Sequence, residues 1–193
     1  MPSSPALVPE LGIGDADSAR LLRSIRELID ATSAAYPVTS ISLVGSRDPR
    51  SYTAHTGRFR AWGAPQCNVG AGNHLAELVQ RYVLKGCELP ITVGESVAIT
   101  TDTLVLYALD GPAGLSAAAP LALLPGAQQR HEWCLKVLRG GAVAWPSSAE
   151  LRADGIVEPA TWLALRELKP AHAEVVASSQ AHGVGRYVAW WKE

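Results

Sequence analysis

The chain is poor in several residue types, and each shortage excludes a class of protein. Only three of its 193 residues are cysteine (Cys67, Cys87 and Cys134), an odd and sparse set that does not suit a disulfide-stapled secreted scaffold. The most apolar segment, residues 113–124, is interrupted by glycine and proline and falls short of the roughly 20 residues that span a bilayer. The first residues lack the basic and apolar regions of a signal peptide. We therefore expect a cytoplasmic protein that does not enter a membrane.

The chain also lacks an excess of charge of either sign. Its 17 lysines and arginines are balanced by 18 aspartates and glutamates, which leaves a formal net charge of -1. Proteins that grip nucleic acid without sequence preference usually carry a strong basic excess, so we expect no nucleic-acid partner. Hydrophobic residues make up 48% of the chain, which predicts a packed core.

The pattern of apolar residues predicts an α+β fold, a mixed sheet with flanking helices. We expect an extended N-terminal arm over residues 1–14, an α/β core over 15–146, and a C-terminal helical segment over 147–193 that packs on the core. Helices are expected around residues 16–36, 74–85, 128–139, 159–169 and 172–181. Strands are expected at residues 38–44, 58–62, 91–93, 96–100, 103–109 and 142–145, the third and fourth forming a hairpin around Gly94.

A strand that ends in glycine and serine is the most informative motif. The β-branched residues Val38–Val44 run directly into Gly45, Ser46 and Arg47. Glycine lets the backbone approach a ligand closely, and the serine hydroxyl can donate to phosphate oxygens. An ordinary turn has the same composition, so the motif predicts a phosphate site only together with its context.

That context resembles the small (minimal) nucleotidyltransferase family. Leu21–Arg47 has the family's order of helix, turn, strand and Gly-Ser-Arg, and Glu132–Trp145 is similar to its later helix, glycine turn and short strand. The resemblance implies a nucleotidyltransferase-like core that binds a nucleotide or another phosphorylated ligand. It also implies two aspartates on the next strand, which hold Mg²⁺ against the phosphates.

In this chain, Arg58 and Arg60 stand where the resemblance implies those aspartates. Arginine cannot ligate Mg²⁺, although its guanidinium group can clamp a phosphate. We therefore expect a degenerate active site that binds a phosphorylated ligand, while Mg²⁺ arriving with a nucleotide stays open. The expected ligand-binding residues are Gly45, Ser46, Arg47, Arg58 and Arg60. The alternative for the two later arginines is the solvated face of an edge strand.

A cysteine-dependent hydrolase or acyl transferase is a second hypothesis. Cys67 precedes a glycine-rich turn and a helix, a position that can favour the thiolate. His131 or His74 would act as its base, and Asp102 or Asn68 would orient that base. Asp102 and Asp110 are also acids that could reach a metal. The candidate catalytic residues are thus Cys67, His131, Asp102 and Asp110.

Two further interpretations stay open at this stage. His131 and Cys134 share a helical face at a spacing that suits zinc, but no Cys-x-x-Cys pair completes a known zinc module, so no metal site is predicted. Trp190 and Trp191 near the C-terminus could form an apolar patch for self-association. A non-enzymatic interaction protein, with a homo-oligomer as one form, is therefore the third hypothesis.

Overall fold

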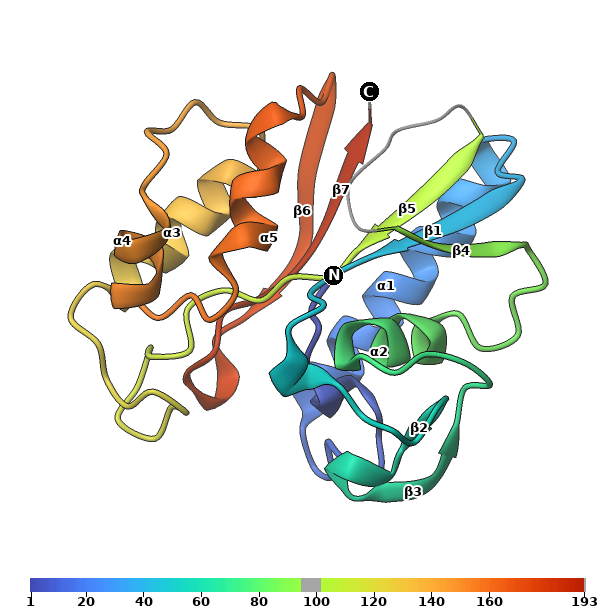
Figure 1. Ribbon diagram of the computed structural model, residues 1–193. Helices are drawn as coiled ribbons and strands as arrows, with labels where there is room; N and C mark the ends of the chain where they lie inside the picture. Colours follow the sequence, from blue (N-terminus) through green and yellow to red (C-terminus); the bar gives the residue numbers. More distant parts are fainter. Residues whose placement is uncertain (95–101, 193) are drawn as a thin grey trace. The chain divides into compact units, whose positions relative to one another are not determined.

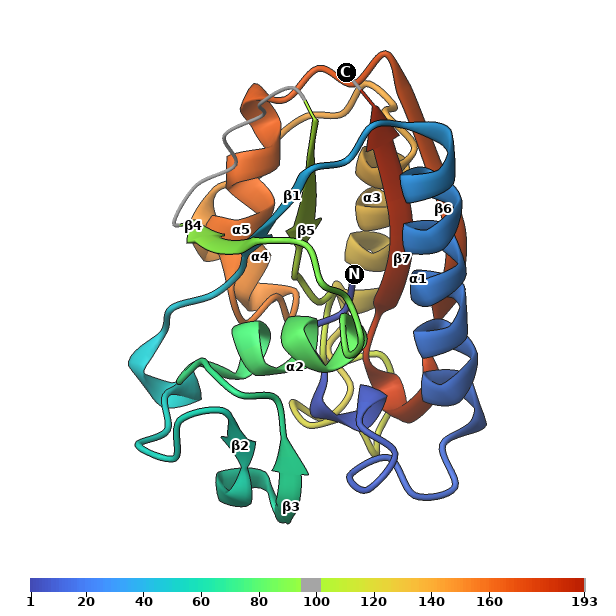
Figure 2. The same cartoon turned by 90° about the vertical axis from the view of Figure 1, so that its right-hand side faces the viewer.

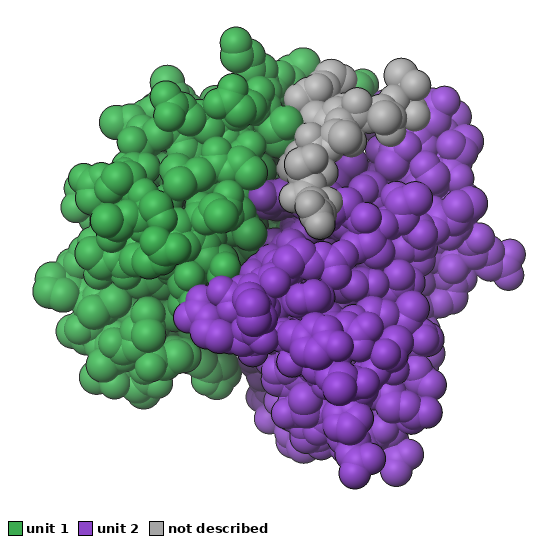
Figure 3. Space-filling view, viewed as in Figure 1, with its two compact units in different colours: residues 1–2, 109–193 green, residues 3–108 purple. Residues whose placement is uncertain are grey.

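Two compact units make up the part of the chain that the structure describes. The structure is a computed structural model and describes residues 1–94 and 102–192. One unit spans residues 3–108, and the other combines residues 1–2 with residues 109–193 (Figure 3). Residues 3–108 are the N-terminal unit, and residues 1–2 with residues 109–193 are the C-terminal unit. The division falls between Ala108 and Leu109, earlier than the boundary at residue 146 that the composition suggested.

A three-stranded parallel sheet forms the centre of the N-terminal unit. β1 (Ser40–Val44) lies between β4 (Ile91–Gly94) and β5 (Thr103–Tyr107), and both neighbours run parallel to it (Figures 1 and 2). At the carboxyl end of the sheet, Val44 is level with Gly94 and Tyr107. The sequence-based α+β class is therefore confirmed. Strands β4 and β5 do not pair with each other, and the strand expected at residues 96–100 lies outside the described residues.

Two helices accompany this sheet. α1 (Ala16–Ala35) begins at Asp15, whose carboxylate accepts from the Ser18 backbone N–H at 2.9 Å and caps the helix. α2 (Leu75–Val83) packs against β1 and α1. The apolar stripes predicted for the two helices and for β1 form the core of this unit. Their deepest side chains are fully buried. These side chains are Leu21, Ile41, Leu43, Leu78 and Val79.

Gln80 ties α2 to the sheet. Its side-chain amide is 1% exposed and donates to the carbonyl oxygens of Val44, at 2.8 Å, and Leu106, at 2.7 Å. These two carbonyls belong to neighbouring strands near the carboxyl end of the sheet. A single side chain of α2 thus satisfies two buried acceptors and holds the helix in register with β1 and β5.

A short hairpin follows the sheet's central strand and corrects one expectation. β2 (Arg58–Phe59) pairs antiparallel with β3 (Ala64–Asn68) in a separate two-stranded sheet. The expected strand at residues 58–62 is only two residues long, because Arg60–Trp62 form a turn of 3-10 helix that ends at Gly63 with φ of 99°. The described residues therefore form three small sheets in place of the single mixed sheet that the sequence suggested.

The N-terminal residues do not form the extended arm that their composition predicted. Pro5–Leu7 form a 3-10 helix that contacts α1 and α2. Leu7 is 1% exposed and Val8 is fully buried. Apolar side chains in a proline-rich segment can be buried without regular structure, which is why the segment joins the core of the N-terminal unit.

The C-terminal unit contains three helices followed by a hairpin. The helices are α3 (Ala127–Leu138), α4 (Ser148–Ala153) and α5 (Pro159–Ala164). A capping box of Ser147 and Glu150 begins α4, and a proline in the first turn begins α5. The hairpin consists of β6 (His172–Ser179) and β7 (Arg186–Lys192), which pair antiparallel, and α3 contacts β6.

Two sequence-based expectations for this unit are wrong. The helix expected at residues 172–181 is strand β6, so residues 147–193 are not a purely helical segment. Val175 and Val176 favour extended backbone, and pairing with β7 outweighs the helix propensity of the neighbouring alanines. The strand expected at residues 142–145 is irregular, and there the Ala144 carbonyl accepts from the Trp133 indole at 3.0 Å.

Aromatic side chains build the core of the C-terminal unit. Trp162 is fully buried, and its ring meets that of Tyr187 edge to face at 6.0 Å between centroids. The Tyr187 hydroxyl lies 2.7 Å from Nδ1 of His131, which is 2% exposed. A Cβ at Gly111 or Gly185 would overlap that hydroxyl. Glycine at these two positions therefore lets the backbone close over the buried His131–Tyr187 pair.

Among the residues that the structure describes, no helix is both long enough and apolar enough to cross a membrane.

The contact of Gln80 with two strands predicts a measurable stability effect. Replacing Gln80 by Leu removes both hydrogen bonds that the side chain donates to buried carbonyl oxygens of β1 and β5. We expect the free energy of unfolding to fall by about 1–3 kcal/mol, as measured by urea denaturation followed by far-UV circular dichroism. The matched control is Gln66→Leu, at an exposed position of the same unit. Its effect is expected to stay within about 0.5 kcal/mol, and equal losses in both variants would contradict the bridging role.

The buried His131 predicts a pH dependence of stability. Burial lowers the pKa of His131 below its ordinary 6.5, so the folded chain keeps the ring neutral. Below pH 6.5 the unfolded chain binds a proton that the folded chain resists. The stability contributed by His131 is therefore complete above that pH and is lost as the pH falls. Urea denaturation between pH 8 and 5 checks this, followed by tryptophan fluorescence because every tryptophan except Trp62 lies in this unit.

Two variants separate His131 from the other titratable groups. We expect His131→Gln to flatten the pH dependence and the exposed His182→Gln to leave it unchanged. An imidazole titration by NMR provides the direct measurement should His131→Gln fold poorly. A pKa for His131 at or above 6.5 in the folded chain would contradict the assignment.

Candidate functional site

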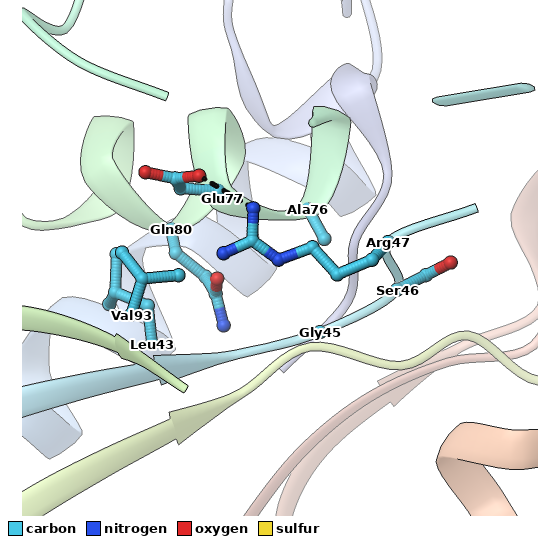
Figure 4. A pocket seen from close by; sticks show the side chains of 8 residues that line it. All are labelled: Leu43, Gly45, Ser46, Arg47, Ala76, Glu77, Gln80 and Val93. Atoms are coloured by element: carbon cyan, nitrogen blue, oxygen red, sulfur yellow. Dashed lines mark hydrogen bonds and ion pairs between the residues drawn. The ribbon is translucent and has the colours of Figure 1, made fainter. Parts of the chain in front are cut away.

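A shallow pocket lies where β1 ends and α2 passes over it. It is a narrow crevice and not a cavity: the space along it, about 160 Å³, includes open solvent, and none of it is wide enough to hold a water molecule in this structure. Strands β1 and β4, the turn after β1 and one side of α2 supply its walls (Figure 4). The lining residues are Leu43, Gly45, Ser46, Arg47, Ala76, Glu77, Gln80 and Val93. Three of the five predicted ligand-binding residues, Gly45, Ser46 and Arg47, therefore share one pocket.

Gly45 has a packing reason for lacking a side chain. A Cβ at this position would lie 2.8 Å from the Ala76 Cβ and 3.2 Å from the Ala108 Cβ. Glycine therefore lets the first turn of α2 approach the end of β1, whereas the sequence suggested that it lets a ligand approach the backbone. The consequence for the site is that the helix N-terminus lies directly beside the Gly-Ser-Arg turn.

Ser46 faces the loop that follows the turn. Its hydroxyl oxygen accepts from the Asp48 backbone N–H at 3.2 Å. Figure 4 shows this hydroxyl pointing away from the Arg47 guanidinium group, which extends over α2. Ser46 thus helps to shape the loop after β1, and the cationic part of the pocket is formed by Arg47.

Glu77 is shared between two arginines. The residue is 7% exposed, and its carboxylate lies 3.2 Å from Nη1 of Arg47 and 2.9 Å from Nε of Arg81. Figure 4 shows the Arg47 side chain reaching over α2 to Glu77. Two guanidinium groups are balanced by one carboxylate, so positive charge is in excess in this cluster. Because Arg47 is the more exposed of the two arginines, it is the one that solvent and a ligand can reach.

His74 completes the cationic side of the pocket. Its Nδ1 lies 3.1 Å from Nη1 of Arg47, and because arginine only donates, Nδ1 is the acceptor and the ring is neutral. Burial, followed by the charge of Arg47, lowers the pKa of His74 below 6.5, while Glu77 opposes the shift. A bound anion would act in the direction of Glu77 and favour the charged imidazolium.

The N-terminus of α2 adds N–H donors to this edge. His74 is the residue just before the first turn of α2, and its side chain makes no hydrogen bond that caps the helix. Backbone N–H groups of a first turn lack helical partners and carry partial positive charge. Gly72, with φ of 99°, brings the preceding loop over the helix, and its Cβ would lie 2.9 Å from Cδ of Glu77. Asn73, the residue before His74, donates its side-chain amide to the Thr53 carbonyl and the Thr56 hydroxyl.

The other predicted ligand and metal candidates do not line this pocket. Arg58 and Arg60 lie in the β2–β3 hairpin and the 3-10 turn that follows β2. Asp102 precedes β5 and its carbonyl accepts from the Thr39 N–H at 2.8 Å. Because β1 and β5 are parallel, Asp102 lies at the amino end of the sheet, opposite the turn. Asp110 belongs to the C-terminal unit, where its carbonyl accepts from the Trp162 indole.

Cys67 does not have the surroundings of an activated nucleophile. It is a buried residue of β3, and six residues separate it from His74, the residue that begins α2. Burial, followed by the charge of Glu10, raises the pKa of its thiol. A nucleophilic thiol needs the opposite shift. His131 belongs to the C-terminal unit, where its ring is engaged with Tyr187.

His131 and Cys134, the two residues whose spacing suits zinc, lie in the core of the C-terminal unit. Cys134 is fully buried on α3, and burial raises the pKa of its thiol. Among the described residues, no three histidine, cysteine, aspartate or glutamate side chains are grouped as a metal site would require.

The two C-terminal tryptophans are partly exposed: Trp191 donates to the Leu138 carbonyl at 2.8 Å, and the Trp190 ring contacts His172.

Sequence reasoning missed the residues that surround Arg47. Glu77 and Arg81 are four apart on a helix, a spacing that predicts an ion pair, but nothing in the sequence links that pair to Arg47. Gln80 lies beside apolar residues on the buried face of α2, and the sequence alone does not predict its hydrogen bonds to the sheet. Tyr52 lies beyond the turn and contacts His74 ring to ring.

Comparison with known proteins adds no relative. No protein-family model, curated protein or solved structure matches the chain. The chemistry of the pocket is therefore the only basis for a functional proposal.

The arrangement around His74 makes a prediction about its pKa. Replacing Arg47 by Met removes a neighbouring positive charge and should raise the pKa of His74 toward 6.5. Replacing Glu77 by Gln removes a negative charge and should lower that pKa further. The imidazole signals of the whole chain, titrated by NMR, provide the measurement. A fall in the pKa of His74 in Arg47→Met would contradict its contact with Arg47, and a rise in Glu77→Gln would contradict the influence of Glu77.

Proposed function

We propose that the N-terminal unit binds a phosphorylated small molecule, such as a nucleotide, at the carboxyl end of β1. The observation that carries the proposal is the position of Arg47, which follows the central strand of a parallel sheet and lies beside a helix N-terminus. Guanidinium groups and helix N-termini both favour phosphate oxygens.

The topology of the sheet supports this location. The chain leaves β1 to reach β4 on one side and later β5 on the other, so the order of the described strands is β4-β1-β5. In open parallel sheets, ligands bind outside the carboxyl ends of the strands where the order reverses. Gly45, Ser46 and Arg47 follow β1 at that reversal.

The ion pairs of Glu77 supply a way for a phosphate to enter. Glu77 contacts both Arg47 and Arg81, so a phosphate can replace Glu77 as the partner of Arg47 while Glu77 keeps Arg81. The exchange leaves no buried charge without a partner, so it avoids the large free-energy cost of an uncompensated buried charge. Binding therefore requires a local change of partners and no rearrangement of the sheet.

The proposal concerns binding and not group transfer. The resemblance to nucleotidyltransferases implies a pair of aspartates, and arginines stand at the corresponding positions Arg58 and Arg60. The hydrolase hypothesis receives no support from Cys67, whose thiol has a raised pKa. A phosphate-binding pocket is the function that fits Arg47, His74 and the α2 N-terminus together.

A binding experiment tests the proposal directly. The whole chain is titrated with ribose 5-phosphate, pyrophosphate and a panel of nucleotides, with and without Mg²⁺, by isothermal calorimetry. We expect Arg47→Met to weaken binding at least about ten-fold, because a hydrogen bond to a charged group contributes about 1.5–3 kcal/mol. Absence of binding across the whole panel would overturn the proposal.

Three control variants locate the site. Arg20→Met removes an exposed arginine of α1 that pairs with Asp17 and should leave affinity unchanged. Ser46→Ala should have a smaller effect than Arg47→Met, because the Ser46 hydroxyl faces away from the guanidinium group. Arg58→Met tests the hairpin arginine, and a loss equal to that of Arg47→Met would move the site to the hairpin.

A further inference from the structure

An exposed tyrosine stands next to the cationic cluster. The Tyr52 side chain belongs to a residue that is 55% exposed, and its ring meets the His74 ring at 5.4 Å between centroids and 69° between planes. Single exposed aromatic residues are common on proteins and need no explanation by themselves. What distinguishes Tyr52 is the sequence of contacts from its ring to the His74 ring and on to the Arg47 guanidinium group.

The backbone holds Tyr52 in this position. Tyr52 and His74 form an antiparallel backbone bridge, and the Tyr52 N–H donates to the Pro49 carbonyl at the end of a 3-10 turn. The turn itself is capped by Asp48, which accepts from the Arg50 backbone N–H at 2.8 Å and from its side chain at 2.9 Å. These hydrogen bonds hold the pKa of the Asp48 carboxyl near 2, so the cap stays charged at neutral pH. An aromatic ring on an anchored backbone loses little freedom when a ligand covers it.

We infer that the ligand of this pocket is a nucleoside 5′-phosphate, with its phosphate on Arg47 and its base stacked against Tyr52. The inference deepens the proposed function and rests on it. One side chain, His74, separates the two ends of the site, and the ribose would lie over it. A phosphorylated sugar would use only the cationic end.

The chemistry of the two ends favours a base over other flat or apolar groups. A nucleobase presents a π face to an aromatic ring, and such stacking contributes about as much as a ten-fold change in affinity or more. A nucleotide is the ligand class that carries a flat ring and a phosphate a ribose apart. In a phosphotyrosine peptide the phosphate is bonded directly to the ring, and a phospholipid headgroup has no aromatic plane, so neither holds a flat ring and a phosphate a ribose apart.

The test compares two ligands that differ only in the base. AMP and ribose 5-phosphate are each titrated into the wild-type chain, Tyr52→Ala and Tyr52→Phe by isothermal calorimetry. We expect AMP to bind at least about ten-fold more tightly than ribose 5-phosphate to the wild type. That preference should disappear in Tyr52→Ala and persist in Tyr52→Phe, which keeps the ring. Ribose 5-phosphate should bind all three equally.

The outcomes separate this inference from the proposed function. If ribose 5-phosphate binds through Arg47 but AMP binds no more tightly, or if Tyr52→Ala keeps the preference, the base assignment is overturned and the phosphate site stands. If neither ligand binds the wild type, the base assignment is overturned, and the phosphate site falls with it when pyrophosphate and the other nucleotides of the panel also fail to bind. Tyr52 is exposed, so both variants should unfold at the wild-type temperature, and circular dichroism checks this. A CMP titration shows whether the stacking surface accepts pyrimidines as well.

Discussion

The close packing of α2 on the end of β1 is the constraint on which the candidate site depends. Gly45 leaves room for Ala76, and Gln80 donates to carbonyls of β1 and β5. Because these contacts fix the helix against the sheet, the first turn of α2 lies beside Arg47. A larger residue at position 45 would push the helix away and separate its N-terminus from the guanidinium group. The polar site is thus set by apolar packing and one buried amide.

Charge sharing around Glu77 follows from that packing. With α2 in place, Glu77 lies between Arg47 and Arg81 and is almost completely buried. A buried carboxylate with one partner would resist losing it, since an uncompensated charge is costly. With two partners, it can release the more exposed arginine. The same arrangement favours a neutral His74: burial lowers the pKa of the ring most, and Arg47 adds a positive charge beside it and donates to Nδ1.

The sequence predicted local elements well and their partners poorly. The stripe of Leu21, Leu22 and Ile25 predicted α1, and Val38–Val44 predicted β1, because both patterns depend on residues close together in the chain. Strand β6 was mistaken for a helix, since its identity depends on pairing with β7. The boundary at residue 108 and the separate β2–β3 sheet also depend on long-range contacts that periodicity does not contain.

The candidate site shows the same limit at the level of single residues. Gly45, Ser46 and Arg47 were predicted as a unit because they are consecutive, and they do share a pocket. Arg58 and Arg60 were added by alignment with a strand of a resembling family, and the structure places them in a hairpin outside the lining residues. Glu77 reaches Arg47 only through folding, and Arg81 and Tyr52 join the cluster through Glu77 and His74, so no spacing rule could have linked them to Arg47.

Burial separates the two histidines that the sequence offered as catalytic bases. His131 is 2% exposed and shares a hydrogen bond with Tyr187, itself fully enclosed, beneath Gly111 and Gly185. A ring held in this way stabilises a core, because a substrate has no route to its nitrogen atoms. His74 is partly exposed and lies between the exposed ring of Tyr52 and the guanidinium group of Arg47. The carboxylate partner of Arg47, Glu77, also pairs with Arg81. Both histidines have lowered pKa values, so the surroundings and not the direction of the shift distinguish a structural histidine from one that can meet a ligand.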